Sequence, residues 1–513
     1  MLPIDNDVRE KILTQEGNVV ISASAGTGKT YTTVLRIVRD AEENKTFQTF
    51  AAITFTRKAA REISTRLGPN AGDGFVGTND NFVWSEIIQP FMYDVYGSDF
   101  KIDIKPDFSN ENQINKFSEG IEKIRNTQFM CKYDDNKKNF AFQLALEILK
   151  NSHTARRYMR AKYYRIYIDE YQDSDVDMHN FFMYLCDKLN IPLFIVGDAK
   201  QSIYGWRGAY SKGFIGLFNK EGFIKFELRH NFRSNQAIQN YSNIFMESVR
   251  QYYKPVKLNN EIMLYKYSSE NDAANYINNW LDKDKKCAIL NFSNNDAKLW
   301  SDRLNKIGID FVYIPSSPLD NVAMESEHIW IARGIANFIL QYRYSEYDFR
   351  DEIPMPENFK ISILKSKLDL IKSNTEEYEV FCNGCFGLYN YLEYQIITEK
   401  IESEVRALYD VVADTQYVAT YNQDRYKFTS GTIHSSKGLE FNQVIIHASN
   451  YNLNRDGINF LHYVAVSRPE ERMLIFAESE YIKTRYLGYI KNAIRSTSSL
   501  GFDVDIEDII KVV

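Results

Sequence analysis

The sequence predicts an α/β protein built from two parallel-sheet lobes, each interrupted by a helical insertion. Apolar runs of strand length alternate with helical patterns in two separate stretches of the chain. This alternation is typical of parallel sheets with helices on both faces. Two long segments between these runs are charged and helical, without a strand–loop–helix pattern. The length of 513 residues also favours several domains, since one domain holds roughly 100–200 residues.

The first lobe opens with strands and helices in alternation, and a long segment then divides it. Its expected strands are residues 18–23, 49–54, 165–169, 193–197 and 224–228. Its expected helices are residues 29–41, residues 58–67 and a helix from Asn235. Residues 76–163 are rich in Asn, Lys and Asp, and we assign them to a first insertion. The first lobe then comprises residues 1–75 and 164–252.

The second lobe repeats this plan after a break near residues 252–257. Its expected strands are residues 261–265, 288–292, 311–314, 428–433, 444–448 and 473–477. Residues 326–414 are again helical and charged, and we assign them to a second, reduced insertion. The second lobe then comprises residues 253–325 and 415–513.

Composition and charge exclude several classes of protein. No apolar run reaches the ~18 residues of a membrane-spanning helix, and the first ten residues lack a signal-peptide pattern. We therefore expect a cytoplasmic protein without a membrane partner. The net charge is −6, so contact with nucleic acid must use a local groove and base stacking. Of five cysteines, Cys382 and Cys385 form a lone CxxC, which we interpret as reduced cysteines on a turn.

A glycine-rich loop follows the first expected strand and precedes a helix, which is the context of a phosphate-binding loop. Its glycines let backbone N–H groups approach phosphate oxygens, Lys29 can reach the β- and γ-phosphates, and Thr30 offers a hydroxyl to Mg²⁺. Ala23 stands where the generic pattern has Gly. The predicted nucleotide-binding loop is Ala23, Ser24, Ala25, Gly26, Thr27, Gly28, Lys29 and Thr30.

An acidic pair ends the strand expected at residues 165–169. Asp169 can hold Mg²⁺ together with Thr30, and Glu170 can polarise the attacking water as a general base. A solvated acidic turn is the alternative for this segment taken alone. The presence of a phosphate-binding loop in the same chain favours the catalytic interpretation.

Five further segments resemble the motifs of superfamily 1 helicases of the UvrD/Rep/PcrA type, in the family order. They are residues 53–60 (motif Ia), 196–209 (III), 231–234 (IV), 432–441 (V) and 463–468 (VI). The resemblance implies two RecA-like lobes, 1A and 2A, with insertions 1B and 2B. It also implies a DNA-dependent ATPase with Mg²⁺ as cofactor, and other purine nucleoside triphosphates are alternatives to ATP.

The same resemblance carries roles to individual residues. Gln201 matches the γ-phosphate sensor, and Arg233 and Arg468 match the arginine fingers. Phe232 and Glu440 match the positions that contact the base and the ribose. The implied DNA contacts are Phe55, Thr56, Trp206, Arg207 and His434. The simpler alternatives are a buried Trp206, structural ion pairs for the two arginines, and a packing role for His434.

Three departures from the family pattern concern the base and the DNA. The family Gln that reads adenine is missing from residues 7–11, and Tyr31 stands near the base where many relatives carry Arg. We therefore expect loose selectivity among purine nucleotides. Residues 77–82 depart from motif Ib, which weakens its DNA contacts. The insertions are short, so unwinding of duplex DNA is less strongly indicated than hydrolysis.

A closer resemblance, over residues 77–80, 138–146 and 168–180, is to the helicase-like subunit of the Gabija anti-phage defence system. It implies a hetero-oligomer with the Gabija nuclease subunit, an OLD-family ATPase–Toprim protein. It also implies activation by single-stranded DNA or DNA ends. Within the first insertion, the apolar residues at 140, 142, 144 and 146 form either a docking face or the insertion's own core.

Two other functions use the same features. A stand-alone 3′–5′ DNA-repair helicase or translocase would carry the same catalytic set without a nuclease partner. A catalytically weak DNA-binding scaffold would use only the fold. The complete set of Lys29, Asp169, Glu170 and Arg468 favours an enzyme over the scaffold.

Overall fold

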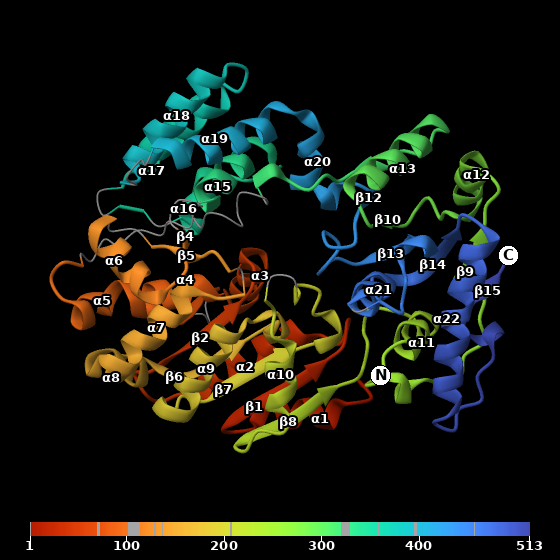
Figure 1. The fold of residues 1–513 in the computed structure, drawn as a ribbon, viewed down its shortest axis with the longest axis horizontal. Coiled ribbons are helices and arrows are strands. Elements are labelled where there is room, and N and C mark those ends of the chain that lie inside the picture. Colours follow the sequence, from red (N-terminus) through yellow and green to blue (C-terminus); the bar gives the residue numbers. More distant parts are fainter. Residues whose placement is uncertain are drawn as a thin grey trace. The chain divides into compact units, whose positions relative to one another are not determined.

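The computed structural model of the chain describes residues 2–68, 72–100, 113–127, 130–135, 137–205, 208–319, 329–353, 355–356, 359–393, 398–455 and 457–513. The chain forms two compact units, and Figure 1 labels their elements. The first contains Met1–Lys105, Glu111–Lys254 and Leu453–Ser467. The second contains Pro255–Asn452 and Arg468–Val513.

A six-stranded parallel sheet in the order β3-β2-β6-β7-β1-β8 forms the centre of the first unit. Its strands are β1 (Asn18–Ala23), β2 (Thr49–Thr54), β3 (Phe75–Thr78), β6 (Tyr163–Ile168), β7 (Leu193–Gly197) and β8 (Phe223–Leu228). Five of them were expected. The sixth, β3, is a short edge strand at the start of the segment that we assigned to the first insertion.

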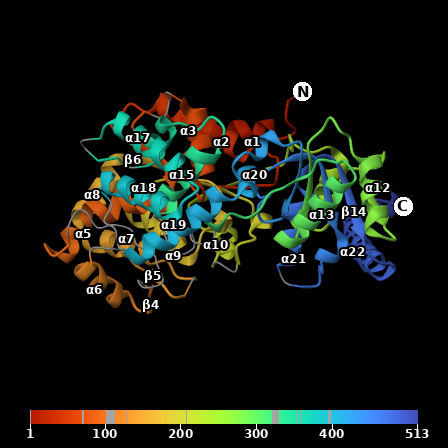
Figure 2. The same cartoon turned by 90° about the horizontal axis from the view of Figure 1, so that it is seen from above.

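Helices cover both faces of this sheet. Figure 2 shows α1 (Asn6–Thr14), α2 (Lys29–Glu43) and α3 (Arg57–Leu67) on one side and α9 (Val176–Leu189) and α10 (Ser211–Leu217) on the other. On the first side, Ile12, Ile37 and Ile63 of the helices share a core with Val19 and Ile21 of β1. Because both faces are buried, the central strands β1, β2, β6 and β7 are apolar along most of their length.

The first insertion packs on this unit as a group of helices. They are α4 (Asn79–Val83), the π-helix Trp84–Ile88, α5 (Gln89–Tyr96), α6 (Phe117–Thr127), α7 (Phe140–Asn151) and α8 (His153–Lys162), with short strands β4 (Gln113–Ile114) and β5 (Lys132–Tyr133). In α7, Phe140, Phe142 and Leu144 are buried. The Phe142 ring lies 5.4 Å from that of Phe181 in α9. The docking interpretation of this apolar face is therefore wrong, because Phe140 packs against Tyr133 within the insertion and Phe142 packs against α9.

The second unit contains a seven-stranded parallel sheet in the order β11-β12-β10-β13-β14-β9-β15. Its strands are β9 (Ile262–Lys266), β10 (Cys287–Asn291), β11 (Val312–Tyr313), β12 (Phe428–Thr432), β13 (Phe441–His447), β14 (Pro469–Ala477) and β15 (Lys511–Val512). Only β15, a two-residue exposed edge strand, was not expected. Its helices include α12 (Glu270–Trp280), α13 (Asn294–Lys306) and α22 (Glu480–Ser498). Two parallel-sheet units confirm the expected α/β fold class.

The second insertion has a core of its own. Its helices are α15 (Ile329–Leu340), α16 (Glu346–Glu352), α17 (Ile361–Lys372), α18 (Tyr378–Tyr391) and α19 (Thr398–Ala413). Cys382 and Cys385 lie inside α18 and are buried in this core, so the expectation of a turn is wrong. Within the described ranges, no cluster of three or more His, Cys, Asp or Glu side chains could hold a metal ion.

Helix α21 (Ile458–Val466) belongs to the first unit, although we assigned residues 415–513 to the second lobe. The helix is apolar on nearly all sides, and the buried His462 ring packs at 4.6 Å from that of Phe245, which follows α11 (Gln236–Ile244). No helix in the described part of the chain has both the length and the apolarity to cross a bilayer.

Candidate active site

The glycine-rich loop joins β1 to α2 with two residues in the left-handed region. Gly26 has φ 75° and Gly28 has φ 76°, a conformation that glycine adopts without strain. Gly26 is also required by space, since a Cβ there would lie 2.4 Å from Oδ1 of Asn231. Gly28 is the N-cap of α2 and has no side chain with which to cap the helix. The first N–H groups of α2 therefore face the loop as potential donors to an anion.

Lys29, at the end of this loop, forms an ion pair with Glu170, which follows β6. The Nζ of Lys29 lies 3.0 Å from Oε1 of Glu170, and their side chains are 11% and 27% exposed. Burial lowers the pKa of Lys29, but the negative charges of Glu170, Asp198 and Asp169 outweigh burial and raise it above its ordinary value. Lys29 is therefore held as a cation beside Glu170 at the start of α2.

Thr30 and Asp169 place two oxygens where one cation could bind both. The Thr30 hydroxyl donates a hydrogen bond of 3.0 Å to Oδ2 of Asp169. Two ligand oxygens at adjacent corners of a Mg²⁺ octahedron are about 2.9 Å apart, given bonds of about 2.05 Å. Burial, and then the charge of Glu170, raise the pKa of Asp169 to about 6. The donor set fits a divalent cation that keeps several waters and phosphate oxygens.

The segment after β7 folds against this acidic pair. Asp198 is fully buried, and its carboxylate accepts a bond of 2.8 Å from Gln201 and lies 2.6 Å from Nζ of Lys200. Gln172 connects the segment to the acidic pair, since it contacts both Glu170 and the N–H of Asp198. The sequence-predicted sensor Gln201 thus contacts Asp198, which Gln172 links to the acidic pair; Gln172 was not singled out from sequence.

Tyr463 of α21 lies against the same segment. It is buried, and Nζ of Lys200 lies 5.6 Å from its ring centroid. Burial raises the pKa of Tyr463, while Lys200 and hydrogen bonding with Ser24 and Ala25 lower it. This tyrosine connects α21 to the nucleotide loop, and sequence reasoning missed its contact with the loop.

Phe232 forms an exposed ring beside the loop. Its side chain is 58% exposed, and its N–H donates to the carbonyl of Gly26 at 2.8 Å. The guanidinium of Arg9 lies over the ring, 4.9 Å from its centroid. Arg233, next in the chain, is half-buried, and its N–H donates to Oδ1 of Asn231 at 2.8 Å. The structure therefore brings Phe232 and Arg233 to the loop, together with an arginine that sequence reasoning passed over.

Arg9 is held by Asp5 and by the loop itself. Its guanidinium contacts Asp5 at 2.8 Å, the carbonyl of Thr27 at 2.9 Å and the Thr32 hydroxyl at 3.2 Å. The buried carboxylate of Asp5 also accepts bonds from two backbone N–H groups, at 2.7 Å from Arg229 and at 3.0 Å from residue 230. An Asp four residues before an Arg was the only sequence signal for this pair.

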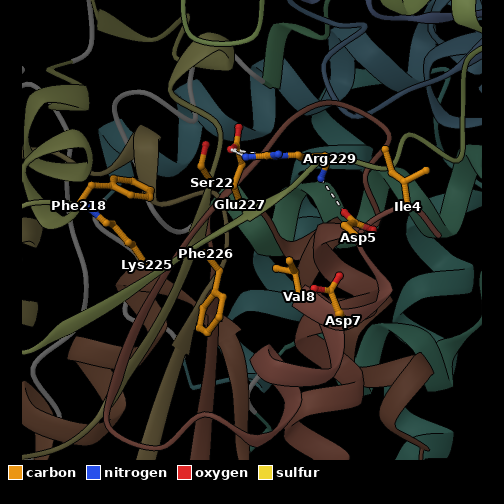
Figure 3. A pocket seen from close by; sticks show the side chains of 10 residues that line it. All are labelled: Ile4, Asp5, Asp7, Val8, Ser22, Phe218, Lys225, Phe226, Glu227 and Arg229. Atoms are coloured by element: carbon orange, nitrogen blue, oxygen red, sulfur yellow. Dashed lines mark hydrogen bonds and ion pairs between the residues drawn. The ribbon is translucent and has the colours of Figure 1, made fainter. Parts of the chain in front are cut away.

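A pocket of about 590 Å³ lies beside Asp5 (Figure 3). It is lined by Asp5 and Val8 of the α1 region and by Lys225 and Glu227 of β8, among others. The lining does not include Lys29, Asp169 or Glu170. The pocket is therefore separate from the acidic pair.

Three other predicted site residues lie on α2 and at the start of α3. Tyr31 is exposed, Phe55 is half-buried and Thr56 caps α3 by accepting from the N–H of Ala59 at 3.2 Å. Trp206 and Arg207 lie outside the described residues.

Three predicted residues belong to the second unit. His434 is half-buried and Glu440 is exposed, both between β12 and β13. Arg468 is buried and donates to the carbonyl of Leu439 at 3.0 Å. The first unit thus brings together the glycine-rich loop, the acidic pair and the exposed ring of Phe232.

The fold and this site define a class of protein, the phosphate-loop nucleoside triphosphatases with parallel-sheet lobes. The model of the UvrD/REP helicase N-terminal domain matches residues 4–81 and 101–221. The chain is 38% identical over 511 residues to Gabija protein GajB of Bacillus cereus (strain VD045), over 95% of this chain and 99% of that protein. The chain therefore belongs to the UvrD/Rep helicase family, in the group that contains Gabija protein GajB.

Other relatives match over shorter lengths. The ATP-dependent DNA helicase PcrA of Staphylococcus epidermidis is 24% identical over 334 residues, which cover 53% of this chain and 45% of PcrA. One subunit of the ATP-dependent helicase/nuclease of Lactobacillus gasseri is 35% identical over 129 residues, which cover 24% of this chain and 10% of that protein. The likeness to the Gabija protein thus extends through both insertions, whereas these two likenesses do not span the chain.

Proposed function

We propose that this chain is a Mg²⁺-dependent nucleoside triphosphatase stimulated by single-stranded DNA, and that it serves as the motor of a Gabija-type anti-phage complex in the cytoplasm. The hydrolytic part rests on one observation, the convergence of Lys29, Thr30, Asp169 and Glu170 beside the first turn of α2. ATP is the expected nucleotide, with other purine nucleoside triphosphates as alternatives.

The ion pair between Lys29 and Glu170 suggests how the site begins a cycle. Lys29 can turn from Glu170 to the γ-phosphate, because the phosphate offers a larger negative charge at the end of the same loop. Glu170 then loses its cation and can accept a proton from the attacking water. A divalent cation bound by Thr30 and Asp169 would neutralise charge on the phosphates. Arg233 and Arg468 are the proposed arginine fingers.

The proposed stimulation by DNA and the proposed role in defence rest on the family to which the chain belongs. PcrA is an ATP-dependent DNA helicase and GajB is a Gabija protein, and the likeness to GajB covers nearly the whole chain. We therefore extend to this chain a partnership with a Gabija nuclease subunit of the OLD-family ATPase–Toprim kind. The proposed DNA contacts remain Phe55, Thr56, Trp206, Arg207 and His434.

Hydrolysis of ATP, GTP, CTP and UTP, each with and without single-stranded DNA, tests the motor assignment. Lys29→Ala should lower kcat on the order of a thousandfold, since it removes a charged donor aimed at the reacting phosphate. Lys220→Ala is the matched control, because it removes only a surface ion pair with Asp187 in the same unit. Wild-type protein without hydrolysis, or Lys29→Ala with normal hydrolysis, would contradict the proposal.

Co-purification with the product of the neighbouring nuclease gene tests the partnership. A stable complex is expected, together with loss of phage protection in Lys29→Ala. If the purified chain alone unwinds a 3′-tailed duplex and no complex forms, the stand-alone repair helicase is the better assignment. Full protection by Lys29→Ala would instead favour the scaffold.

A further inference from the structure

We propose that Gln172 is a positioning residue for nucleotide hydrolysis, which holds the carboxylate of Glu170 and connects it to the segment after β7. Gln172 lies in the 3₁₀ turn Tyr171–Asp173, directly after the acidic pair, and its side chain is fully buried. The inference rests on the proposed function, in which Glu170 accepts the proton of the attacking water.

Both ends of the Gln172 amide are used. Its Nε2 donates to Oε2 of Glu170 at 2.5 Å, and its Oε1 accepts from the N–H of Asp198 at 2.8 Å. The orientation of the amide follows from these partners. A flipped amide would set its oxygen against the Glu170 carboxylate and its NH₂ group against the N–H of Asp198, so both contacts would become repulsive.

The backbone around the amide has no spare room. A Cβ on Gly197, the last residue of β7, would lie 2.7 Å from Oε1 of Gln172. The hydroxyl of Ser202 donates to the carbonyl of Gln172 at 3.2 Å, and the N–H of Tyr210 donates to the carbonyl of Ser174 at 2.7 Å. The loop after β6 and the segment after β7 are thus joined by side-chain and backbone bonds.

Glu170 has particular need of such a restraint. Its backbone has φ 55°, which is uncommon for a residue other than glycine, and its side chain is 27% exposed. Lys29 contacts Oε1, whereas Gln172 contacts Oε2. The bond to Gln172 therefore persists when Lys29 turns to a phosphate. It keeps the Glu170 carboxylate in place after Lys29 has left it, when the carboxylate can accept a proton from the attacking water.

The bond also makes the position of Glu170 depend on the segment that carries Gln201. Asp198 accepts from Gln201 through its carboxylate and donates to Gln172 through its backbone. A shift of this segment would therefore move both the predicted γ-phosphate sensor and the general base. Gln172 is in this way the link between the two.

A double-mutant cycle on the full-length chain tests the proposal. We would measure kcat and KM for ATP at saturating single-stranded DNA in the wild type, Gln172→Met, Glu170→Gln and the double variant. Gln172→Met keeps the volume and removes both bonds. It should lower kcat about tenfold to a hundredfold, within the range of a misplaced general base, and change KM less than about threefold.

The decisive comparison is made in the Glu170→Gln background. There Gln172→Met should lower kcat less than about twofold, because its effect passes through Glu170. Gln172→Glu keeps an acceptor for Asp198 but sets an anion against Glu170, so it should lose at least as much activity as Gln172→Met. If Gln172→Met does not fold, Gln172→Asn replaces it, since that amide is too short to reach both partners.

Gln443→Met is the matched control. Gln443 is also fully buried, and its amide joins β13 to both backbone groups of Asp282 in the second unit. This change should lower the melting temperature and leave kcat within about twofold. Unchanged kcat in Gln172→Met, or equal fold losses in both backgrounds, would overturn the inference alone. Absence of hydrolysis in the wild type would overturn the proposed function and the inference with it.

Discussion

Replacement of Arg9 by Met should weaken nucleotide binding through the base and not through the phosphates. The guanidinium lies over one face of Phe232 and is bound to Asp5 on α1 and to the Thr27 carbonyl in the phosphate loop. It thus holds the exposed ring in place before a nucleotide arrives. A ring that is already ordered costs less entropy when a base stacks on it.

The size of the effect follows from the contacts that are lost and kept. Asp5 keeps two backbone donors after the change, the N–H groups of Arg229 and His230, so its buried carboxylate is still hydrogen-bonded. The stability cost should then be about 2 kcal/mol, below the 3–5 kcal/mol of an orphaned buried charge. Loss of the cation–π contact costs about 1 kcal/mol, and the Phe232 ring is then no longer ordered before the base binds. Together these two effects correspond to a fivefold to tenfold rise in KM for ATP.

Inorganic tripolyphosphate has no base, so its inhibition constant reports binding through the phosphates alone. Its inhibition constant should change less than about twofold in Arg9→Met, while KM for ATP rises. Arg39→Met, which removes an exposed ion pair with Glu43 on α2, should change neither constant. If both constants rise by the same factor in Arg9→Met, Arg9 acts on the phosphate loop through Thr27, and the reasoning about the ring is refuted.

Four further predictions concern the site and the stability of the first unit. Glu170→Gln should still bind nucleotide but hydrolyse it about 10²- to 10⁴-fold more slowly, and equal losses of binding and turnover would contradict its role as base. GTP should be hydrolysed within about a hundredfold of ATP, a gap of about 2.7 kcal/mol, because Phe232 can stack on either purine; a larger gap would indicate an adenine reader. Trp206→Ala should raise the DNA concentration for half-maximal stimulation, since stacking contributes about 1–3 kcal/mol per base, and an unchanged midpoint would indicate a structural tryptophan. Burial lowers the pKa of His462 to about 3 in the folded state, against about 6.5 in the unfolded chain. The free energy of unfolding is therefore unaffected by His462 above pH 6.5, and it falls by about 1.4 kcal/mol per pH unit as the pH is lowered from 6.5 to 3. His462→Phe should therefore lose about 2 kcal/mol less than the wild type between pH 7.5 and 5 in urea unfolding, and an equal loss would show that other groups cause it.

The limits of sequence reasoning are clearest at the edges of the fold. The central strands β1, β7 and β10 were found because they are buried on both faces, which leaves a nearly continuous apolar pattern in the chain. The edge strands β3 and β15 were missed, whereas the two-residue edge strand β11 was found, so a run of so few residues is not a dependable signal of a strand. The cysteine pair was placed on a turn because its spacing alone does not distinguish a turn from one side of a helix.

The sequence by itself determined the chemistry of the phosphate site, although the roles of its residues remain predictions. A phosphate loop needs neighbouring residues in a set order, so Gly26, Gly28, Lys29 and Thr30 could be assigned from spacing alone. The position of Asp169 and Glu170 at the end of an apolar strand, in a chain that carries this loop, then indicated their roles. Each of these inferences depends on residues that are close in the chain, where order and spacing are visible.

Only the tertiary structure decided which distant side chains hold that site in place. Asp5 reaches backbone groups more than 220 positions later, and Gln172 bonds to Asp198 across 26 positions. The apolar face of α7 could have faced a partner or a core, and packing against α9 settled the choice. Such contacts depend on how the strands are ordered in the sheet, and no local pattern encodes that order, because any apolar strand can pair with any other.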